Sequence, residues 1–239
     1  MASSGTYTYS LSNGEAVLAA FDRIQLRYPA IQQHHMQTAR REINLLFSEW
    51  SNRQVNLWEV PNTPNQLTLV QGTGNYTLPS NVVMILDAFR SINTGQSNET
   101  DIYMTPISRT EYASYAAKFN QGPPIVFWFE RRITPTITFY PVPDGSGPYV
   151  FNYYPVTQIQ DANLPGGETP DLPYRWYDPL VAGMTKRLGV CYPPQGVDML
   201  AWRKEIDAEY ERAWTLAATQ DTENVPLSLM PGIGGYYRR

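Results

Sequence analysis

The chain has 239 residues, 42% of them hydrophobic, and carries a formal net charge of −4 at pH 7. This acidic balance argues against a protein whose main task is to coat nucleic acid, because a basic surface supplies most of the affinity in that class. The longest apolar runs, 82–86 and 125–129, are too short to span a bilayer, and the N-terminal stretch lacks the pattern of a secretory signal. We therefore expect a soluble protein of the cytoplasm with no membrane contact.

Composition also bears on the surface of the protein. Only 17% of the residues are charged, 13% are aromatic, and arginine makes up all but three of the 18 basic residues. Protein interfaces are enriched in Arg, Tyr and Trp and depleted in Lys, so this composition favours a large contact surface. A bias of the source genome is the alternative explanation. Cys191 is the only cysteine, so no intrachain disulfide is possible, and we expect it to be a buried helix thiol.

Two helices are predicted at the N-terminal end. Apolar residues recur with helical spacing over 15–28, with Asn13 as the expected cap, and again over 31–52 in a stripe from Met36 to Trp50. Because the connection between the two segments is short, we expect an antiparallel pair.

The pattern then becomes β-rich up to about residue 155. The segments 82–88 and 125–130 are apolar on both faces and predict two strands buried in one sheet. The alternating segment 136–140 predicts a hairpin with 149–154, because a Pro-Asp-Gly-Ser-Gly turn sequence separates them.

One short helix is predicted inside this β-rich region. Ser108 and Glu111 have the spacing of a capping box, in which each side chain bonds to the other residue's backbone amide. The apolar side of the helix would consist of Tyr112, Tyr115, Ala116 and Phe119.

Two further helices are predicted near the C-terminal end. Asp178 followed by Pro179 is typical of a helix start, because proline at the first helical position loses no bonded amide. A longer helix over 197–219 would follow, with Arg203 and Asp207 able to pair on its outer side.

These elements predict an α+β protein. Its core would be an antiparallel helical bundle of two N-terminal and two C-terminal helices, with a β-rich insertion and an extended C-terminal tail. The expected divisions are 1–60 for the N-terminal helical pair, 61–170 for the insertion, 171–220 for the C-terminal pair and 221–239 for the tail.

No residue pattern indicates catalysis, a cofactor or a metal site. His34 and His35 are adjacent, so on a helix we expect them to point about 100 degrees apart, and neither has a metal ligand at helical spacing. Glu205 and Glu209 would repel slightly on the exposed side of the last helix. We therefore predict that the protein is not an enzyme.

Several segments taken together resemble a known family. The ending at 234–239 is Gly-Gly-Tyr-Tyr-Arg-Arg, and the internal segments are Leu46–Val60 (LFSEWSNRQVNLWEV), Tyr76–Pro79 (YTLP), Pro106–Tyr112 (PISRTEY) and Tyr140–Asp144 (YPVPD). In this order they resemble the head-to-tail adaptor proteins, also called tail accessory or head-completion proteins, of short-tailed bacteriophages.

The resemblance implies a structural virion protein made in the host cytoplasm. Such proteins dock beneath the portal protein as a ring of about twelve neighbouring copies, extend a channel through which DNA passes without sequence-specific binding, and provide the platform for the tail tube or nozzle protein. By the same resemblance, the C-terminal segment would dock into the portal through Tyr236, Tyr237, Arg238 and Arg239. No cofactor is implied.

Two other functions fit the same sequence. A non-catalytic carbohydrate-binding module of a phage or bacterial surface would also be acidic and rich in aromatic residues; there, Trp58, Trp128 and Trp176 would face an open groove, whereas in an adaptor they would face a core or an interface. A glycoside hydrolase is the third possibility, because that chemistry needs only two facing carboxyl groups in a cleft.

Overall fold

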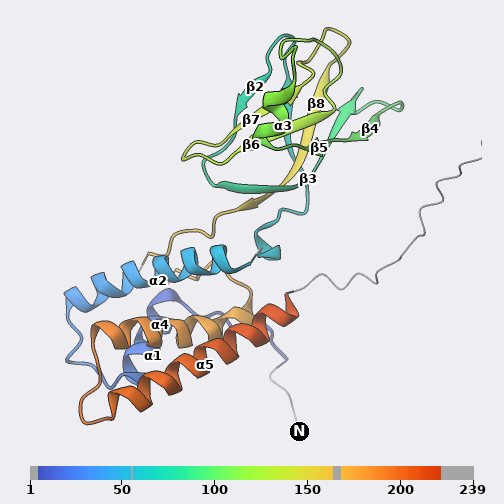
Figure 1. The fold of residues 1–239 in the computed structure, drawn as a ribbon. Helices are drawn as coiled ribbons and strands as arrows, with labels where there is room; N and C mark the ends of the chain where they lie inside the picture. Colours follow the sequence, from blue (N-terminus) through green and yellow to red (C-terminus); the bar gives the residue numbers. More distant parts are fainter. Residues whose placement is uncertain (1–4, 55, 164–167, 222–239) are drawn as a thin grey trace, which may run out of the picture.

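The computed structural model describes residues 5–54, 56–163 and 168–221. Figure 1 shows a helical body and a β-rich part that projects from it. Both ends of the described chain belong to the helical body, so the β-rich part is inserted between α2 and α4. The α+β class is confirmed, since these residues form five α-helices and two β-sheets.

The helical body is organised around α4. Its elements are α1 (Asn13–Arg23), α2 (Gln33–Arg53), η1 (Leu57–Glu59), η2 (Tyr174–Trp176), α4 (Tyr177–Cys191) and α5 (Met199–Gln220). The helices α1, α2 and α5 all contact α4. A β-carbon on Gly183 of α4 would lie 2.8 Å from the Leu46 side chain of α2 and 3.0 Å from the Tyr210 ring of α5. Glycine at this position therefore lets both neighbouring helices approach α4 closely.

The β-rich part is built from two four-stranded sheets. Its elements are β1 (Asn65–Leu69), β2 (Asn75–Thr77), β3 (Val82–Ile92), β4 (Thr100–Tyr103), β5 (Thr105–Pro106), α3 (Arg109–Ser114), β6 (Val126–Glu130), β7 (Thr136–Tyr140) and β8 (Tyr149–Thr157). The strand orders are β1-β8-β3-β4 and β2-β7-β6-β5. Residues of both sheets share one hydrophobic cluster, which is separate from the cluster of the helical body.

The predicted strand partners are wrong. The segments 82–88 and 125–130 lie in different sheets, as parts of β3 and β6. The segments 136–140 and 149–154 do not form a hairpin, because β7 pairs with β2 and β6, and β8 pairs with β1 and β3. Phe139 of β7 and Phe151 of β8 instead pack ring to ring in the core, with 4.8 Å between centroids. The turn between them therefore carries the chain from one sheet to the other.

The helix ends also differ from their predictions in part. The cap of α1 is Ser12, whose hydroxyl oxygen accepts from the amide of Glu15, and the Glu15 carboxylate accepts in return from the amide of Ser12. Asn13, the predicted cap, is the first helical residue and is buried. Ser108 does cap α3, but this helix ends at Ser114 and buries none of its residues, while Phe119 beyond it is 91% exposed.

Two smaller predictions about the C-terminal helices are wrong as well. Cys191 is exposed, because it is the last residue of α4 and lies beyond the part of the helix that the other helices cover. Asp207 of α5 pairs with Lys186 of α4, at 3.1 Å, where the sequence had suggested Arg203 as its partner. Asp207 pairs with a residue of α4 because α5 packs against α4.

Candidate assembly surfaces

The two histidines have a structural role at the start of α2. The His35 ring accepts a hydrogen bond through Nδ1 from the amide of Gln32, at 2.9 Å, and packs against Tyr192. The rings of His34 and His35 lie 3.9 Å apart, so the prediction that they diverge is wrong in this first helical turn. Burial, with a smaller contribution from His34, lowers the pKa of His35. Within 5–54, 56–163 and 168–221, no three His, Cys, Asp or Glu side chains are grouped to hold a metal ion.

Carboxylates of the helical body are engaged in ion pairs between helices. Glu209 accepts from Arg23 of α1 at 3.0 Å. Arg187 of α4 reaches Glu49 at 2.7 Å and Glu42 at 3.3 Å, both on α2. Arg53 of α2 bonds both carboxylate oxygens of Glu211 on α5, at 2.8 and 3.0 Å. These ion pairs link α1 to α5, α2 to α4 and α2 to α5.

A buried polar chain passes through the same interface. The Trp50 indole donates to the Tyr210 hydroxyl at 3.0 Å, and this hydroxyl donates to Glu49 at 3.0 Å. Burial opposes ionisation of Glu49, but the hydrogen bonds from Arg187 and Tyr210, with the charge of Arg53, hold its pKa below the ordinary value. Sequence reasoning missed Tyr210; the only available signal was one more aromatic residue in a helix already rich in apolar positions.

The three tryptophans that separate an adaptor from a sugar-binding module all pack against other aromatic rings. Trp176 is fully buried and packs 5.0 Å from Trp50 and 4.7 Å from Trp58 in the helical core. Trp128 of β6 is half-buried, and Tyr112 of α3 stacks on it at 5.5 Å. This arrangement favours packing over sugar stacking for these rings.

The C-terminal segment begins beside a well-fixed helix end. Asp221, which follows α5, is buried and pairs with Arg175 of η2. A groove of about 240 Å³ lies between η2 and the last turns of α5, and its rim includes the exposed side chains of Tyr174 and Leu216. The predicted portal-docking residues, Tyr236, Tyr237, Arg238 and Arg239, lie outside the described residues.

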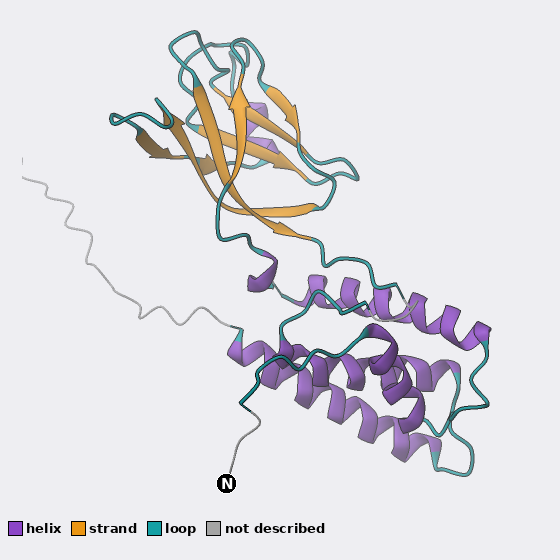
Figure 2. Ribbon diagram, turned by 180° about the vertical axis from the view of Figure 1, so that it is seen from behind, coloured by secondary structure: helices purple, strands orange, loops and turns teal. Residues whose placement is uncertain are grey.

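The helical body and the β-rich part meet at a narrow junction. Two connections join them, one through η1 and one following β8 (Figure 2). The Thr157 hydroxyl bonds to the carbonyl oxygen of Glu59 at 3.1 Å and to its carboxyl group at 3.3 Å. Burial, assisted by the charge of Asp171, raises the pKa of Glu59 to about 7.

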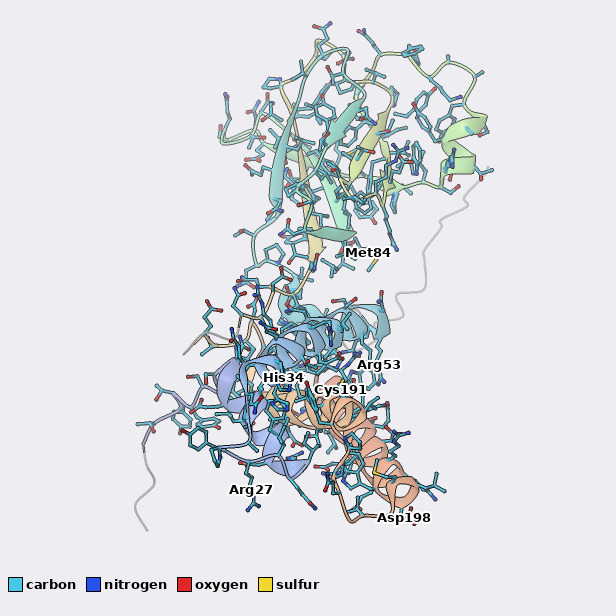
Figure 3. All side chains as sticks on the ribbon, turned by 90° about the vertical axis from the view of Figure 1, so that its left-hand side faces the viewer. Arg27, His34, Arg53, Met84, Cys191 and Asp198 are labelled. Carbon is cyan, nitrogen blue, oxygen red and sulfur yellow. The ribbon has the colours of Figure 1, made fainter. Side chains whose placement is uncertain are left out.

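A cleft lies on one side of this junction. It has a volume of about 250 Å³ and is bounded by Ser51 and Asn52 of α2 and by Met84 and Val156 of the β-rich part. Figure 3 shows Met84 at the end of the β-rich part nearest the helices. The two hydrophobic clusters therefore do not merge at this side of the junction.

None of the helices in the described part of the chain combines the length and apolarity needed to cross a membrane. No curated protein matches the sequence. A family model described as SU10 adaptor protein matches residues 15–229. The match spans both the helical body and the β-rich part, and it ends before the four C-terminal residues predicted to dock. The chain therefore belongs to the SU10 adaptor protein family, whose members are structural adaptors of bacteriophages.

Proposed function

We propose that this protein is the head-to-tail adaptor of a short-tailed bacteriophage. It docks beneath the portal protein as a ring of about twelve copies, extends the DNA channel without reading sequence, and provides the platform for the tail tube or nozzle protein. The observation that carries the proposal is the family match over both parts of the chain. It is a virion component made in the host cytoplasm, and it acts through contacts, not through catalysis.

The two parts divide this work. Residues 1–60 and 171–220 form the helical bundle, 61–170 form the β-rich insertion, and 221–239 form the tail. The ion pairs between α2, α4 and α5 support a rigid body for ring contacts. The β-rich part, attached through a narrow junction, supplies a second surface for neighbouring copies or for the tail.

Portal docking is assigned to the C-terminal segment through Tyr236, Tyr237, Arg238 and Arg239. Aromatic and arginine side chains dominate interface energies, at roughly 2 kcal/mol or more for each anchor. Residues 225–239 contain no acidic side chain, so an acidic, aromatic-lined pocket of the portal would suit them. The Arg175–Asp221 pair holds Asp221, the last described residue, against η2 of the helical body.

Co-sedimentation with purified portal rings tests this assignment. We expect the full chain to bind, and a variant with Tyr236, Tyr237, Arg238 and Arg239 all replaced by alanine to lose most of the bound fraction while its melting temperature stays unchanged. The control replaces Tyr174, an exposed residue at the groove beside Asp221, with alanine and should bind normally. Unchanged binding of the fourfold variant would place the docking surface elsewhere, and electron microscopy of the complex would count the copies.

A further inference from the structure

A mostly apolar hollow lies beside η1, at the junction between the helical body and the β-rich part. It has a volume of about 400 Å³. Its walls belong to the segment around η1 and to strands β3 and β8, through Leu57, Val60, Pro61, Leu86, Asp87 and Tyr154. The pairing of β3 with β8 shifts register between Ile85 and Asp87, so Leu86 lies at a β-bulge. Two successive residues, Leu86 and Asp87, therefore line the same hollow, whereas side chains of a regular strand alternate between faces.

Asp87 gives the hollow a negative charge. The residue is exposed, and it forms no ion pair with any basic side chain of the described residues. The other wall residues named above are uncharged. A group that fits this hollow is therefore an apolar side chain with a cation close beside it.

The turn between β6 and β7 presents this combination. Ile133 of the turn is 95% exposed. Arg132 pairs with Glu130 of β6 at 2.8 Å, whereas Arg131 forms no ion pair with another described residue. In Figure 1 this turn projects from the side of the β-rich part. Single exposed apolar residues are common on protein surfaces; what distinguishes Ile133 is the unpaired arginine two positions before it, which matches the carboxylate of the hollow.

The hollow and the turn are two different surfaces of the chain. The strands that line the hollow, β3 and β8, belong to one sheet, and the turn joins two strands of the other sheet. A contact between two different surfaces of identical chains is heterologous, so it repeats from copy to copy and generates a ring when the rotation closes. Every copy then offers one turn and one hollow.

We propose that the hollow receives the 131–134 turn of a neighbouring copy of this chain. Ile133 enters among the apolar side chains of the hollow, and Arg131 pairs with Asp87. The inference rests on the proposed function, since it names a contact between neighbouring copies of the ring. One apolar side chain and one ion pair are much less than a stable interface of roughly 1,200 Å². The contact is therefore transient between free chains and persists between copies that are held side by side.

Cross-linking between two full-length cysteine variants tests the contact. Both carry Cys191→Ser, which removes the only native cysteine. One adds Thr134→Cys, beside Ile133 in the turn, and the other adds Asn62→Cys, on the wall of the hollow. In oxidised glutathione, this pair should form a mixed disulfide dimer about tenfold faster than Thr134→Cys mixed with Thr68→Cys, an exposed position on β1. Because each chain has a single cysteine, a contact within one chain cannot produce the dimer.

Charge reversal identifies the residues in contact. Asp87→Arg in the Asn62→Cys chain should slow cross-linking about fivefold, as expected for a partly exposed ion pair, and Arg131→Glu in the Thr134→Cys chain should restore the rate. Arg109→Glu, at an exposed arginine of α3, is the matched control and should not restore it.

Ile133→Ser tests the apolar part of the contact. The substitution in the Thr134→Cys chain should slow cross-linking about tenfold, because the burial of the isoleucine is lost. An unchanged rate with Ile133→Ser would overturn the proposal, as would a failure of the paired charge reversal to restore the rate. Equal rates for Asn62→Cys and Thr68→Cys would also overturn it, and would show that the hollow takes a different occupant.

The assay contains no portal protein, so its result is separate from portal docking. Failed cross-linking with normal co-sedimentation on portal rings would refute this contact alone. Specific cross-linking without co-sedimentation would support the contact between copies, while the portal assignment would be wrong.

Discussion

The indole of Trp50 and the hydroxyl of Tyr210 meet at 3.0 Å, and both side chains are fully buried although 160 residues separate them in the chain. This hydrogen bond joins α2 to α5 across the face of α4. It places the Trp50 segment, one of those on which the family resemblance depends, at the centre of the helical body. We therefore expect this segment to matter first for the stability of the helical body.

Tyr210→Phe tests the buried polar chain. The substitution removes the hydroxyl that accepts from Trp50 and donates to Glu49, and it leaves both partners buried or half-buried without it. We expect a loss of about 1–3 kcal/mol in the free energy of unfolding, measured by urea denaturation. Tyr174→Phe, at an exposed tyrosine, is the control and should change little. Equal stability of Tyr210→Phe and the unmodified protein would contradict the prediction.

Gly183→Val tests the close approach of the helices. The new side chain would press on Leu46 and Tyr210, so we expect a loss of about 1–3 kcal/mol of stability from overpacking. Gly14→Ala in α1 is the matched control, because its β-carbon would meet no atom within 4 Å, and alanine raises helix propensity. The control should be neutral or stabilising in the same thermal melts, and a harmless Gly183→Val would show that α4 can move aside.

The free energy of unfolding should depend on pH through Glu59 at the junction, and Glu59→Gln should remove this dependence. The pKa of Glu59 is about 7 in the folded protein and its ordinary value is 4.5, so the folded state binds the proton more tightly. Stability from this group is complete below about pH 4.5 and falls as the pH rises through 7. We expect the unmodified protein to lose about 2 kcal/mol relative to Glu59→Gln over this window. Urea titrations at several pH values measure it, and parallel curves for the two proteins would contradict it.

Arg175→Gln tests the end of α5. Asp221 is buried, so loss of its partner leaves a buried charge without compensation, and we expect a cost of about 2 kcal/mol or more. Hydrogen exchange should quicken in the last turn of α5 before other parts of the helix. The double variant Arg175→Gln/Asp221→Asn should recover part of the stability. If the double variant is no more stable than Arg175→Gln, loss of the ion pair does not explain the loss of stability in Arg175→Gln.

Local patterns predicted the helices well and the sheet partners poorly. The predicted segments 31–52 and 197–219 nearly coincide with α2 and α5, because helical periodicity is a property of consecutive residues. The partners of β7 and β8 depend on contacts between distant segments, and alternation alone says only that a strand has two faces. The turn sequence at 143–147 was read correctly as a turn, but its strands belong to different sheets.

For the candidate sites too, local patterns were visible in the sequence and contacts between distant segments were not. The sequence indicated the absence of a catalytic pattern and pointed to the C-terminal residues, which stay a prediction. It could not reveal the burial of Asn13, because Asn13 bonds to Asn163 and Glu168, which lie 150 or more residues further along the chain. Asn13 is therefore buried at the start of α1, where the sequence predicts an exposed cap.

The bond between Thr157 and Glu59 means that the chain leaves the β-rich part close to where it entered. A loop whose two ends are held together adds little closure entropy when its length changes. Residues between these two points can therefore be exchanged for a longer, shorter or differently shaped unit without altering the spacing of α2 and α4. The arrangement of the helical body is therefore independent of the size and shape of the part that projects from it.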